Sequence, residues 1–292
     1  MGQGAGECRV PLWTLPRLYF RARHPAVVAI TDARLRERYD GIVRVAVAKG
    51  RVLVAFSGGV DSGLVARLVH DALGDRGLAV IADAETLSRR ELEAAKTVSE
   101  EIGVPLRVVP VSELASEEYR RNPANRCYFC RRELAGVLAD IARREGFNAI
   151  ADGINASDLG DDRPGIRAMD EAGVWHPLLE AGMTKADVRA MAKALGLSFW
   201  DKPSNACLAS RIPHGTPVTV GLLRRVEAAE DYLRGRGFRQ VRVRHHGTVA
   251  RIEVPPEDIA RLEGIHPEVS AALRTFGYST TEIDPRGYRS LG

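Results

Sequence analysis

The stretch RVLVAFSGGVDSGLVARLV, residues 51–69, decides how this chain folds. It opens with RVLVAF (Arg51–Phe56), an apolar run of strand length that predicts a strand buried on both faces of a parallel sheet. The glycine turn Ser57–Gly59 follows, and apolar residues then recur at helical spacing from Asp61 to Leu73. A strand that turns through glycines into a helix brings backbone amides and a helix N-terminus together, which makes an anion-binding site.

Strand and helix patterns alternate along the first two thirds of the chain. We expect further strands at 78–82, 107–111 and 149–152 and further helices at 33–50, 89–102 and 131–145. Such alternation predicts a doubly wound α/β domain with a parallel sheet, whose ligands bind beyond the carboxyl ends of the strands.

The pattern changes near Pro203. A Gly- and Pro-rich stretch is followed by a helical pattern at 220–234 and by RQVRVRHHGTVARIEV (239–254), which predicts a β-hairpin turning at 246–248. The end of the chain, IDPRGYRSLG, is expected to form a closing strand or arm. The expected organisation is therefore an N-terminal extension at 1–32, a nucleotide domain at 33–203 and a smaller α+β domain at 204–292.

The loop Ser57-Gly58-Gly59-Val60-Asp61-Ser62 has the residue types that phosphate binding needs. Its glycines let the backbone approach a phosphate, the hydroxyls of Ser57 and Ser62 can donate to phosphate oxygens, and Asp61 can hold Mg²⁺ or cap the helix. The loop has neither the Gly-Lys-Ser/Thr of a Walker loop nor the dinucleotide pattern GxGxxG. The simpler interpretation is a glycine turn with a serine cap.

Two later segments are expected at the same rim of the sheet. Gly153 follows the fourth predicted strand and would let the backbone approach a ligand, while Asp152 or Asp158 would hold a metal or a ribose, or cap a turn. Arg163 and Arg167 would bind phosphate or carboxylate, or lie in solvent.

Three of the four cysteines indicate metal or sulfur chemistry. Cys127 and Cys130 form a CxxC that we expect just before a helix, and Cys207 follows 77 positions later. Without a secretion signal these cysteines are not a disulfide framework. The residues alone leave open a redox pair, a zinc site completed by His214 or Cys8, and a [4Fe–4S] cluster with one open iron. Outside a zinc site, Cys8 is expected to be a bystander.

Two of these motifs resemble those of a known enzyme group. SGGVDS resembles the PP-loop of the N-type ATP pyrophosphatases, which bind the pyrophosphate of ATP while a substrate oxygen attacks the α-phosphorus. HPLLEAGMTKADVR (176–189) resembles the PL…K…R segment of that group, whose lysine neutralises phosphate. The resemblance gives this role to Lys185, one of only five lysines in the chain; a surface lysine on a helix is the alternative.

The whole set of motifs is more specific. SGGVDS, NPANRCYFC, ADGINASDLGDDRPGIRA, HPLLEAGMTKADVR, WDKPSNACLASRIPHG and VRVRHHGTVARIEV, in this order, resemble the LarE family, the ATP-dependent sulfur transferases of nickel-pincer cofactor synthesis. The likeness covers about residues 35 to 292. It implies an enzyme that adenylates a carboxylate of pyridinium-3,5-biscarboxylic acid mononucleotide and converts it to a thiocarboxylate.

The resemblance also implies site residues. Members with only the cysteine equivalent to Cys207 give up its sulfur, whereas members with three cysteines use a cluster, so we expect Cys127, Cys130 and Cys207 to hold [4Fe–4S]. Cys207 and Asp61 would be catalytic. ATP and Mg²⁺ are the other expected cofactors, and the expected ATP-binding residues are Ser57, Gly58, Gly59, Asp61, Ser62, Gly153 and Lys185.

Charged residues of the second domain are the expected substrate ligands. Arg211, Arg242 and Arg244 would hold the phosphate and carboxylates of the mononucleotide, unless they are a basic strand face. Glu230, on the preceding helix, is a weaker metal candidate. Relatives form symmetric assemblies, which implies a homo-oligomer, a trimer or a hexamer, and the external sulfur donor stays open.

Composition limits the alternatives. At 45% hydrophobic and 27% charged, the 292 residues have the composition of a folded protein. The apolar runs are far shorter than the roughly 20 residues of a membrane helix, and the N-terminus lacks a signal-peptide pattern, so we expect a cytoplasmic protein without a membrane partner.

Two rival functions are weaker. A net charge of +4 without a basic stripe argues against a nucleic-acid partner, and hence against a tRNA-thiolating enzyme of the same superfamily. A non-catalytic nucleotide-binding or zinc-binding protein would not need Asp61, Lys185 and Cys207 together.

Overall fold

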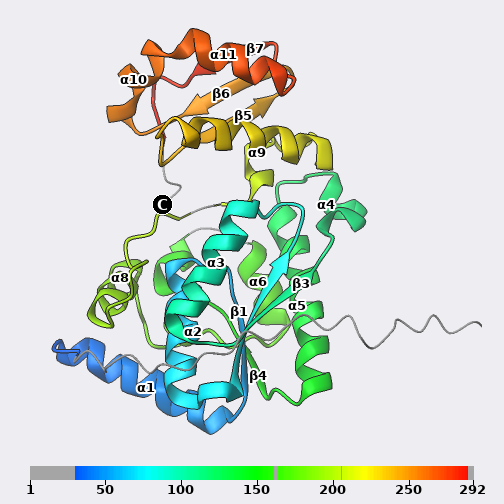
Figure 1. Ribbon diagram of the computed structural model, residues 1–292. Coiled ribbons are helices and arrows are strands. Elements are labelled where there is room, and N and C mark those ends of the chain that lie inside the picture. Colours follow the sequence, from blue (N-terminus) through cyan, green and yellow to red (C-terminus); the bar gives the residue numbers. More distant parts are fainter. Residues whose placement is uncertain (1–29, 161–163, 205, 289–292) are drawn as a thin grey trace, which may run out of the picture.

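The larger part of the molecule is built on a parallel sheet. In a computed structural model, which describes residues 30–160, 164–204 and 206–288, four parallel strands run in the order β3-β2-β1-β4 (Figure 1). These strands are β1 (Val52–Ala55), β2 (Gly77–Asp83), β3 (Leu106–Pro110) and β4 (Ala149–Ala151). The predicted doubly wound α/β fold is confirmed. The N-terminal extension, with Cys8, lies outside the described residues.

Helices cover both faces of this sheet. The helices of this larger part are α1 (Ala33–Lys49), α2 (Val60–Leu73), α3 (Arg89–Ile102), α4 (Glu117–Arg120), α5 (Arg126–Glu145), α6 (Pro164–Glu171), α7 (Pro177–Glu180) and α8 (Lys185–Ala194), of which the short α4 packs beside α5 and the turn η2 (Glu113–Ala115) rather than on the sheet. Short 3₁₀ turns are η1 (Gly74–Arg76), η2 (Glu113–Ala115), η3 (Ala156–Gly160), η4 (Leu208–Arg211) and η5 (Pro256–Asp258).

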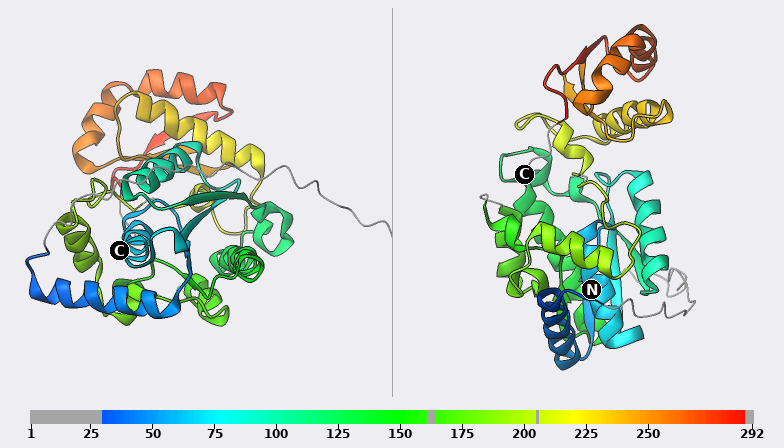
Figure 2. Two further views of the ribbon diagram at one scale, coloured as in Figure 1. Left: turned by 60° about the horizontal axis from the view of Figure 1, so that its bottom comes forward. Right: turned by 90° about the vertical axis from the view of Figure 1, so that its left-hand side faces the viewer.

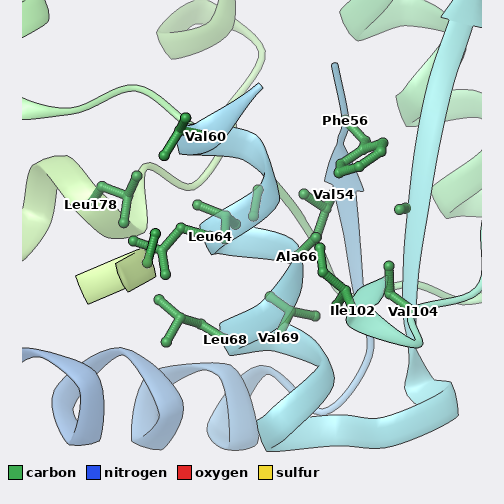
Figure 3. Close-up of a cluster of buried hydrophobic side chains, with 14 of the residues drawn as sticks. Val54, Phe56, Val60, Leu64, Ala66, Leu68, Val69, Ile102, Val104 and Leu178 are labelled. Atoms are coloured by element: carbon green, nitrogen blue, oxygen red, sulfur yellow. The ribbon is translucent and has the colours of Figure 1, made fainter. Parts of the chain in front are cut away.

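The buried strand β1 joins two hydrophobic cores. Val52 and Val54 point to the face covered by α1, α2, α3 and α8, whereas Leu53 and Ala55 point to the face covered by α5 and α6. Figure 3 shows part of the first core, in which Val54 of β1 lies beside Ala66 of α2. Because both faces of β1 are enclosed, its sequence is continuously apolar rather than alternating.

Helix α8 is fixed at its N-terminus. Thr184 and Asp187 form a reciprocal capping box, and the Asp187 carboxylate also accepts hydrogen bonds from Arg34 (2.6 Å) and Arg38 (2.7 Å) of α1. Burial disfavours the charge of Asp187, but the hydrogen bonds from Thr184 and the two arginines outweigh it, and the pKa of Asp187 is lowered. This anchoring fixes the start of the helix that carries Lys185.

A smaller unit follows, with its own sheet and core. Its elements are α9 (Val220–Gly235), β5 (Arg242–His246), β6 (Val249–Glu253), α10 (Ile259–Gly264), α11 (His266–Thr275) and β7 (Thr280–Ile283). Strands β5 and β6 form the predicted hairpin, and β7 pairs with β6 in parallel. Of the two forms expected for the end of the chain, a closing strand or an arm, the described part fits the arm: β7 ends at Ile283, and Tyr288 N–H, after the turn at Pro285, donates to the Val254 carbonyl at 2.7 Å.

The smaller unit lies beyond the carboxyl ends of the larger sheet. Figures 1 and 2 show α9 and the small sheet at that end of the molecule, with η4 between the two units. Within the described residues, no helix has the length and apolar character to cross a membrane.

Candidate active site

A cleft of about 350 Å³ lies where the carboxyl ends of the strands meet the smaller unit. Six of the predicted site residues line it: Ser57, Gly59, Asp61, Lys185, Cys207 and Arg211. Glu230, the weaker metal candidate, also lines it, and Glu91, Glu113 and Lys202 are among the other charged residues of its wall. The sequence therefore predicted several residues of one cavity from segments more than a hundred positions apart.

The phosphate loop is held in shape by its own side chains. Ser57 N–H donates to the Ser62 hydroxyl at 3.1 Å, and the two hydroxyls lie 3.0 Å apart. Gly58 has φ +69°, and a Cβ there would lie 2.5 Å from the Cβ of Ala95 on α3. Only glycine fits this position, since both its backbone conformation and its packing exclude a side chain.

Asp61, in the first turn of α2, is the centre of the polar contacts at the loop. Its carboxylate forms an ion pair with Lys185 and accepts a hydrogen bond from Asn155 Nδ2 at 3.2 Å. Both partners come from segments after β4, so the three side chains meet only in the folded protein. Asn155 was not singled out in the sequence, because amides in turns are common.

Gly153 packs against the start of α2, and its predicted approach to a ligand stays a prediction. A Cβ at this position would lie 2.7 Å from the backbone nitrogen of Ser62 and 3.0 Å from the Cβ of Asp61. The close approach that requires glycine is therefore to the start of α2. Gly153 contacts the end of the phosphate loop at Asp61 and Ser62, and it does not belong to the cleft lining.

Lys202 is a second lysine at the loop, which the sequence analysis missed. Its ammonium donates to the Gly58 carbonyl at 3.1 Å and forms an ion pair with Glu91 at 3.0 Å. Two features of the sequence pointed to it: lysine is rare in this chain, and Lys202 lies within the motif WDKPSNACLASRIPHG.

The CxxC lies inside a helix. Cys127 and Cys130 occupy the first turns of α5, which begins at Arg126, so the prediction that they precede a helix is wrong. The helix starts early because Arg126 is buried and donates to Asn122 Oδ1 and to the Ala209 carbonyl (3.0 Å), contacts that an apolar pattern does not reveal.

The segment with Cys207 is anchored beside α5. Leu208 N–H donates to the Thr86 carbonyl at 2.9 Å, and the buried amide of Asn122 donates to the carbonyls of Pro213 (2.8 Å) and Thr216 (2.9 Å). The two Asn122 bonds hold the segment after Cys207 against the segment before Cys127, although 91 and 94 positions separate the bonded residues.

Two of the thiols, those of Cys130 and Cys207, are in an environment that disfavours their charged forms. Burial first, and the neighbouring Glu113 carboxylate second, raise the pKa of Cys130 well above its usual value; its thiol donates to Glu113 at 2.7 Å. Cys207 is solvent-exposed, but the surrounding cleft limits its hydration and raises its pKa, with Arg126 opposing and Glu113 and Cys127 adding to the shift. The three cysteines are free.

Arg211 and Glu230 form a buried ion pair between η4 and α9. Arg211 Nε donates to Glu230 Oε1 at 2.7 Å, and Arg234 donates to Glu230 Oε2 at 2.7 Å. Arg211 also donates to the carbonyls of Ala206 (2.5 Å) and Cys207 (3.1 Å). These donors hold the backbone around Cys207, and a metal at Glu230 would have to compete with two guanidinium groups.

The two other predicted arginines lie on β5. Arg244 makes a two-pronged pair with Glu253 (2.9 and 3.1 Å) and donates to the Ser210 carbonyl at 2.8 Å. Arg242 lies over the ring of Tyr288, 4.3 Å from its centre, and burial lowers its pKa. Neither belongs to the cleft lining, but Arg244 contacts η4 directly.

Asp152 and Asp158 are used in local contacts. The Asp152 carboxylate contacts His176 Nδ1 (2.7 Å) and accepts from Ile154 N–H, while Asp158 accepts from Asn155 N–H (3.0 Å). The turn-cap interpretation fits both better than metal binding. Arg167 forms an ion pair with Glu171 on α6, and Arg163 lies outside the described residues.

Neither metal-site alternative is settled by the described side chains. Within the described part of the chain, no group of three His, Cys, Asp or Glu side chains, the three cysteines included, is arranged to hold a metal ion. A zinc site would need four ligands about 2.0–2.3 Å from one ion, and Cys8, one of its candidate ligands, lies outside the described residues. Three free thiols are the type of ligand that an iron–sulfur cluster uses, and both metal sites stay predictions.

Comparison with known proteins gives matches of two kinds. A profile of the NAD synthase family matches residues 34–129. Over about 240 residues, or 82% of this chain, three curated proteins align: an uncharacterized protein of Synechocystis sp. (43% identical, 90% of its length), pyridinium-3,5-bisthiocarboxylic acid mononucleotide synthase of Lactiplantibacillus plantarum (38%, 87%) and an uncharacterized protein of Methanocaldococcus jannaschii (25%, 91%).

Proposed function

Because this chain belongs to the LarE family, we propose that it converts a carboxylate of pyridinium-3,5-biscarboxylic acid mononucleotide to a thiocarboxylate, with ATP as the activating substrate. The name of the Lactiplantibacillus plantarum relative gives the product class. The match of residues 34–129 to NAD synthase supports an ATP-binding PP-loop.

The single observation that supports this function most is the shared cleft. The phosphate loop and Lys185 line one part of it, and Cys207 lines another. A substrate carboxylate activated at the loop would therefore stay within reach of the sulfur-bearing segment, without release of a reactive acyl adenylate.

Activation is assigned to the residues of the loop. The amides of the glycine turn and the hydroxyl of Ser57 would bind the pyrophosphate part of ATP, and Lys185 would neutralise its charge. Asp61 would hold Mg²⁺, which releases Lys185 from its ion pair with Asp61 for the phosphates. The substrate carboxylate would then displace pyrophosphate from the α-phosphorus, leaving AMP as the leaving group for the second step.

Sulfur transfer is assigned to Cys127, Cys130 and Cys207. When bound by these three thiolates, a [4Fe–4S] cluster would supply an open iron that carries the sulfur to be transferred. Arg211 and Arg126 would keep the Cys207 segment in place through their bonds to the Cys207 and Ala209 carbonyls. Arg242 and Arg244 would bind the phosphate and carboxylates of the substrate, with Arg244 exchanging its bond to Glu253 for a substrate anion.

The product test is direct. Purified protein is incubated anaerobically with the pyridinium mononucleotide, MgATP and sulfide, and products are identified by mass spectrometry. The proposal expects AMP, pyrophosphate and a mononucleotide in which sulfur has replaced a carboxylate oxygen. Formation of thiolated nucleosides in a parallel reaction with tRNA, and no reaction with the mononucleotide, would assign the chain to the rival thiolase function.

The sulfur source is tested on the protein itself. A cluster mechanism expects protein prepared without oxygen to be brown, with about four iron per chain after reconstitution and loss of iron in each single Cys→Ala variant. A sacrificial mechanism expects spent protein lighter by the mass of one H₂S, with Cys127→Ala and Cys130→Ala fully active. Cys8→Ala is the matched control and should change neither result.

A further inference from the structure

Lys202 lies at the phosphate loop, in the cleft that Lys185 also lines, and brings a second positive charge to the loop. Its ammonium lies 3.1 Å from the carbonyl oxygen of Gly58, inside the loop, and it lines the same cleft as Ser57 and Lys185. Lys185 reaches the loop from α8, whereas Lys202 comes from the segment between α8 and η4. The loop therefore has a lysine from each of two separate segments.

The resting partner of Lys202 is an acidic side chain on α3. Glu91 and Ala95 lie one helical turn apart, and the face that they share meets the loop, because Ala95 packs against Gly58 and Glu91 pairs with Lys202 at 3.0 Å. Both Glu91 and Lys202 border the cleft and keep about a fifth of their side-chain surface exposed, 19% and 21%. An anion entering the cleft can reach this pair.

The two lysines have parallel arrangements. Lys185 is paired with Asp61 and Lys202 with Glu91, so each of the two lysines has a carboxylate partner. A partly exposed lysine–carboxylate pair is weak, whereas an ammonium bound to phosphate oxygens makes charge-assisted hydrogen bonds. A polyphosphate is therefore able to displace Glu91 from Lys202.

We propose that Lys202 is a phosphate-binding residue that leaves Glu91 when ATP binds, and that the Glu91 carboxylate competes with a phosphate of ATP for Lys202. The inference rests on the proposed function, because it assumes that ATP is the ligand of the loop. It adds a cation from the segment that ends in Cys207, only five positions further on. A phosphate bound by Lys202 then fixes one end of this segment, and the Leu208–Thr86 backbone bond fixes the other.

A binding experiment with two opposite variants tests the inference. Affinities are measured by calorimetry for an ATP analogue with a methylene in place of the α,β-bridging oxygen, for inorganic pyrophosphate and for AMP. Lys202→Met should weaken the analogue and pyrophosphate about ten-fold and leave AMP unchanged, because one charge-assisted contact is lost. Glu91→Gln should tighten the analogue about two-fold to five-fold, because a competing anion is removed.

The double variant separates ligand binding from structure. In the Lys202→Met background, Glu91→Gln should have no further effect on affinity, since the competition no longer exists. Lys202→Arg keeps the charge and should stay within about three-fold of the wild type. Lys96→Met, on α3 and paired with Glu93 outside the cleft lining, is the matched control and should bind as the wild type does.

The outcomes distinguish this inference from the function on which it rests. If Lys185→Met loses affinity and Lys202→Met binds as the wild type does, the inference is overturned and the ATP site stands. If Glu91→Gln weakens binding together with a lowered melting temperature, the pair is structural and the inference is overturned. If the wild type binds neither the analogue nor pyrophosphate, the proposed function itself is wrong.

Discussion

The ion pairs at the phosphate loop and those behind Cys207 differ in exposure. Lys185 and Asp61 retain 30% and 26% of their side-chain surface, whereas Arg211 and Glu230 retain 1% and 0%. The partly exposed pairs Lys185–Asp61 and Lys202–Glu91, here called the open pairs, lie where a charged ligand can replace one partner. The buried pair Arg211–Glu230, here called the closed pair, is shielded from solvent, so neither partner can be replaced by water. Arg211 also donates to the Cys207 carbonyl and so holds the backbone there. Exposure therefore separates cations available to a ligand from cations that build the site.

This difference follows from the cost of removing charges from water. In a partly exposed pair, each charged group gains little free energy from its partner and loses little when that partner is replaced. A buried pair has lost its hydration, so removing one partner leaves a charge with no compensation. The comparison predicts that variants of the closed pair affect stability, while variants of the open pairs affect ligand binding.

The largest effect is expected at Glu230. Glu230→Gln leaves two guanidinium groups near a neutral amide, and we expect the free energy of unfolding to fall by about 3–5 kcal/mol. Urea unfolding followed by circular dichroism measures the change. Glu268→Gln is the control: Glu268 pairs with Arg236 on the surface of the same unit, and its loss should cost less than about 1 kcal/mol. Equal effects of the two variants would remove the distinction between open and closed pairs.

At the open pair, Asp61→Asn should reduce substrate-dependent pyrophosphate release about a hundred-fold while changing stability by less than about 1 kcal/mol. The reason is that Asp61 serves Mg²⁺ and phosphate rather than the core. Asp71→Asn, on the same helix and paired with Arg67 outside the cleft lining, provides the comparison and should keep normal release. Wild-type release by Asp61→Asn would show that the loop has no such role.

The sequence predicted the loop well because its chemistry is local. A buried strand, two glycines and a helix start lie within residues 51–69, so neighbouring residues specify the local structure on which the predicted anion site depends. Lys185 was found through a motif, and Cys207 through its residue type. The parallel sheet and the hairpin followed from periodicity, which the backbone geometry imposes directly.

The contacts that build the cleft could not be predicted in the same way. Asn122, Arg126 and Lys202 act through partners about 80 to 150 positions away, and nothing in their immediate neighbours specifies those partners. The role of Arg211 in substrate binding stays a prediction, and its residue type alone does not reveal the buried pair that it forms with Glu230. Exposure, the property that separates the two groups of ion pairs, is created only by folding.

Arg244 is intermediate between the two groups. Its pair with Glu253 keeps 23% and 13% of the side-chain surfaces, so a substrate anion can compete for it. We expect Arg244→Ala to weaken the pyridinium mononucleotide about ten-fold and to leave ATP affinity unchanged. Titration calorimetry with each ligand measures this, with Arg236→Ala as a surface control. A loss confined to ATP would mean that the two ligand positions are reversed.

The smallest effect is expected at His176, which has one buried and one exposed partner, Asp152 (3%) and Asp170 (58%). Burial disfavours its charge, but hydrogen bonds and charges of Asp152 and Asp170 outweigh it, so the pKa of His176 is raised. The protonated form therefore stabilises the fold fully below the unfolded pKa of about 6.5, and this contribution is lost as pH rises through the folded pKa.

His176→Gln should remove this decline, which we expect to be on the order of 1 kcal/mol. Urea unfolding of both proteins from pH 5.5 to 8.5 gives the comparison. Wild-type stability that rises relative to the variant with increasing pH would show that His176 is neutral in the folded protein.

The central claim is that one cleft carries two separable steps, the activation of the substrate carboxylate by ATP and the transfer of sulfur to it. Pyrophosphate release and thiocarboxylate formation are measured in the same anaerobic reaction for the wild type, Asp61→Asn and Cys207→Ala, with substrate and MgATP present. We predict that Asp61→Asn loses both products, whereas Cys207→Ala still releases pyrophosphate and forms no thiocarboxylate. Thiocarboxylate formed by Cys207→Ala, or wild-type protein that releases no pyrophosphate, would contradict the account.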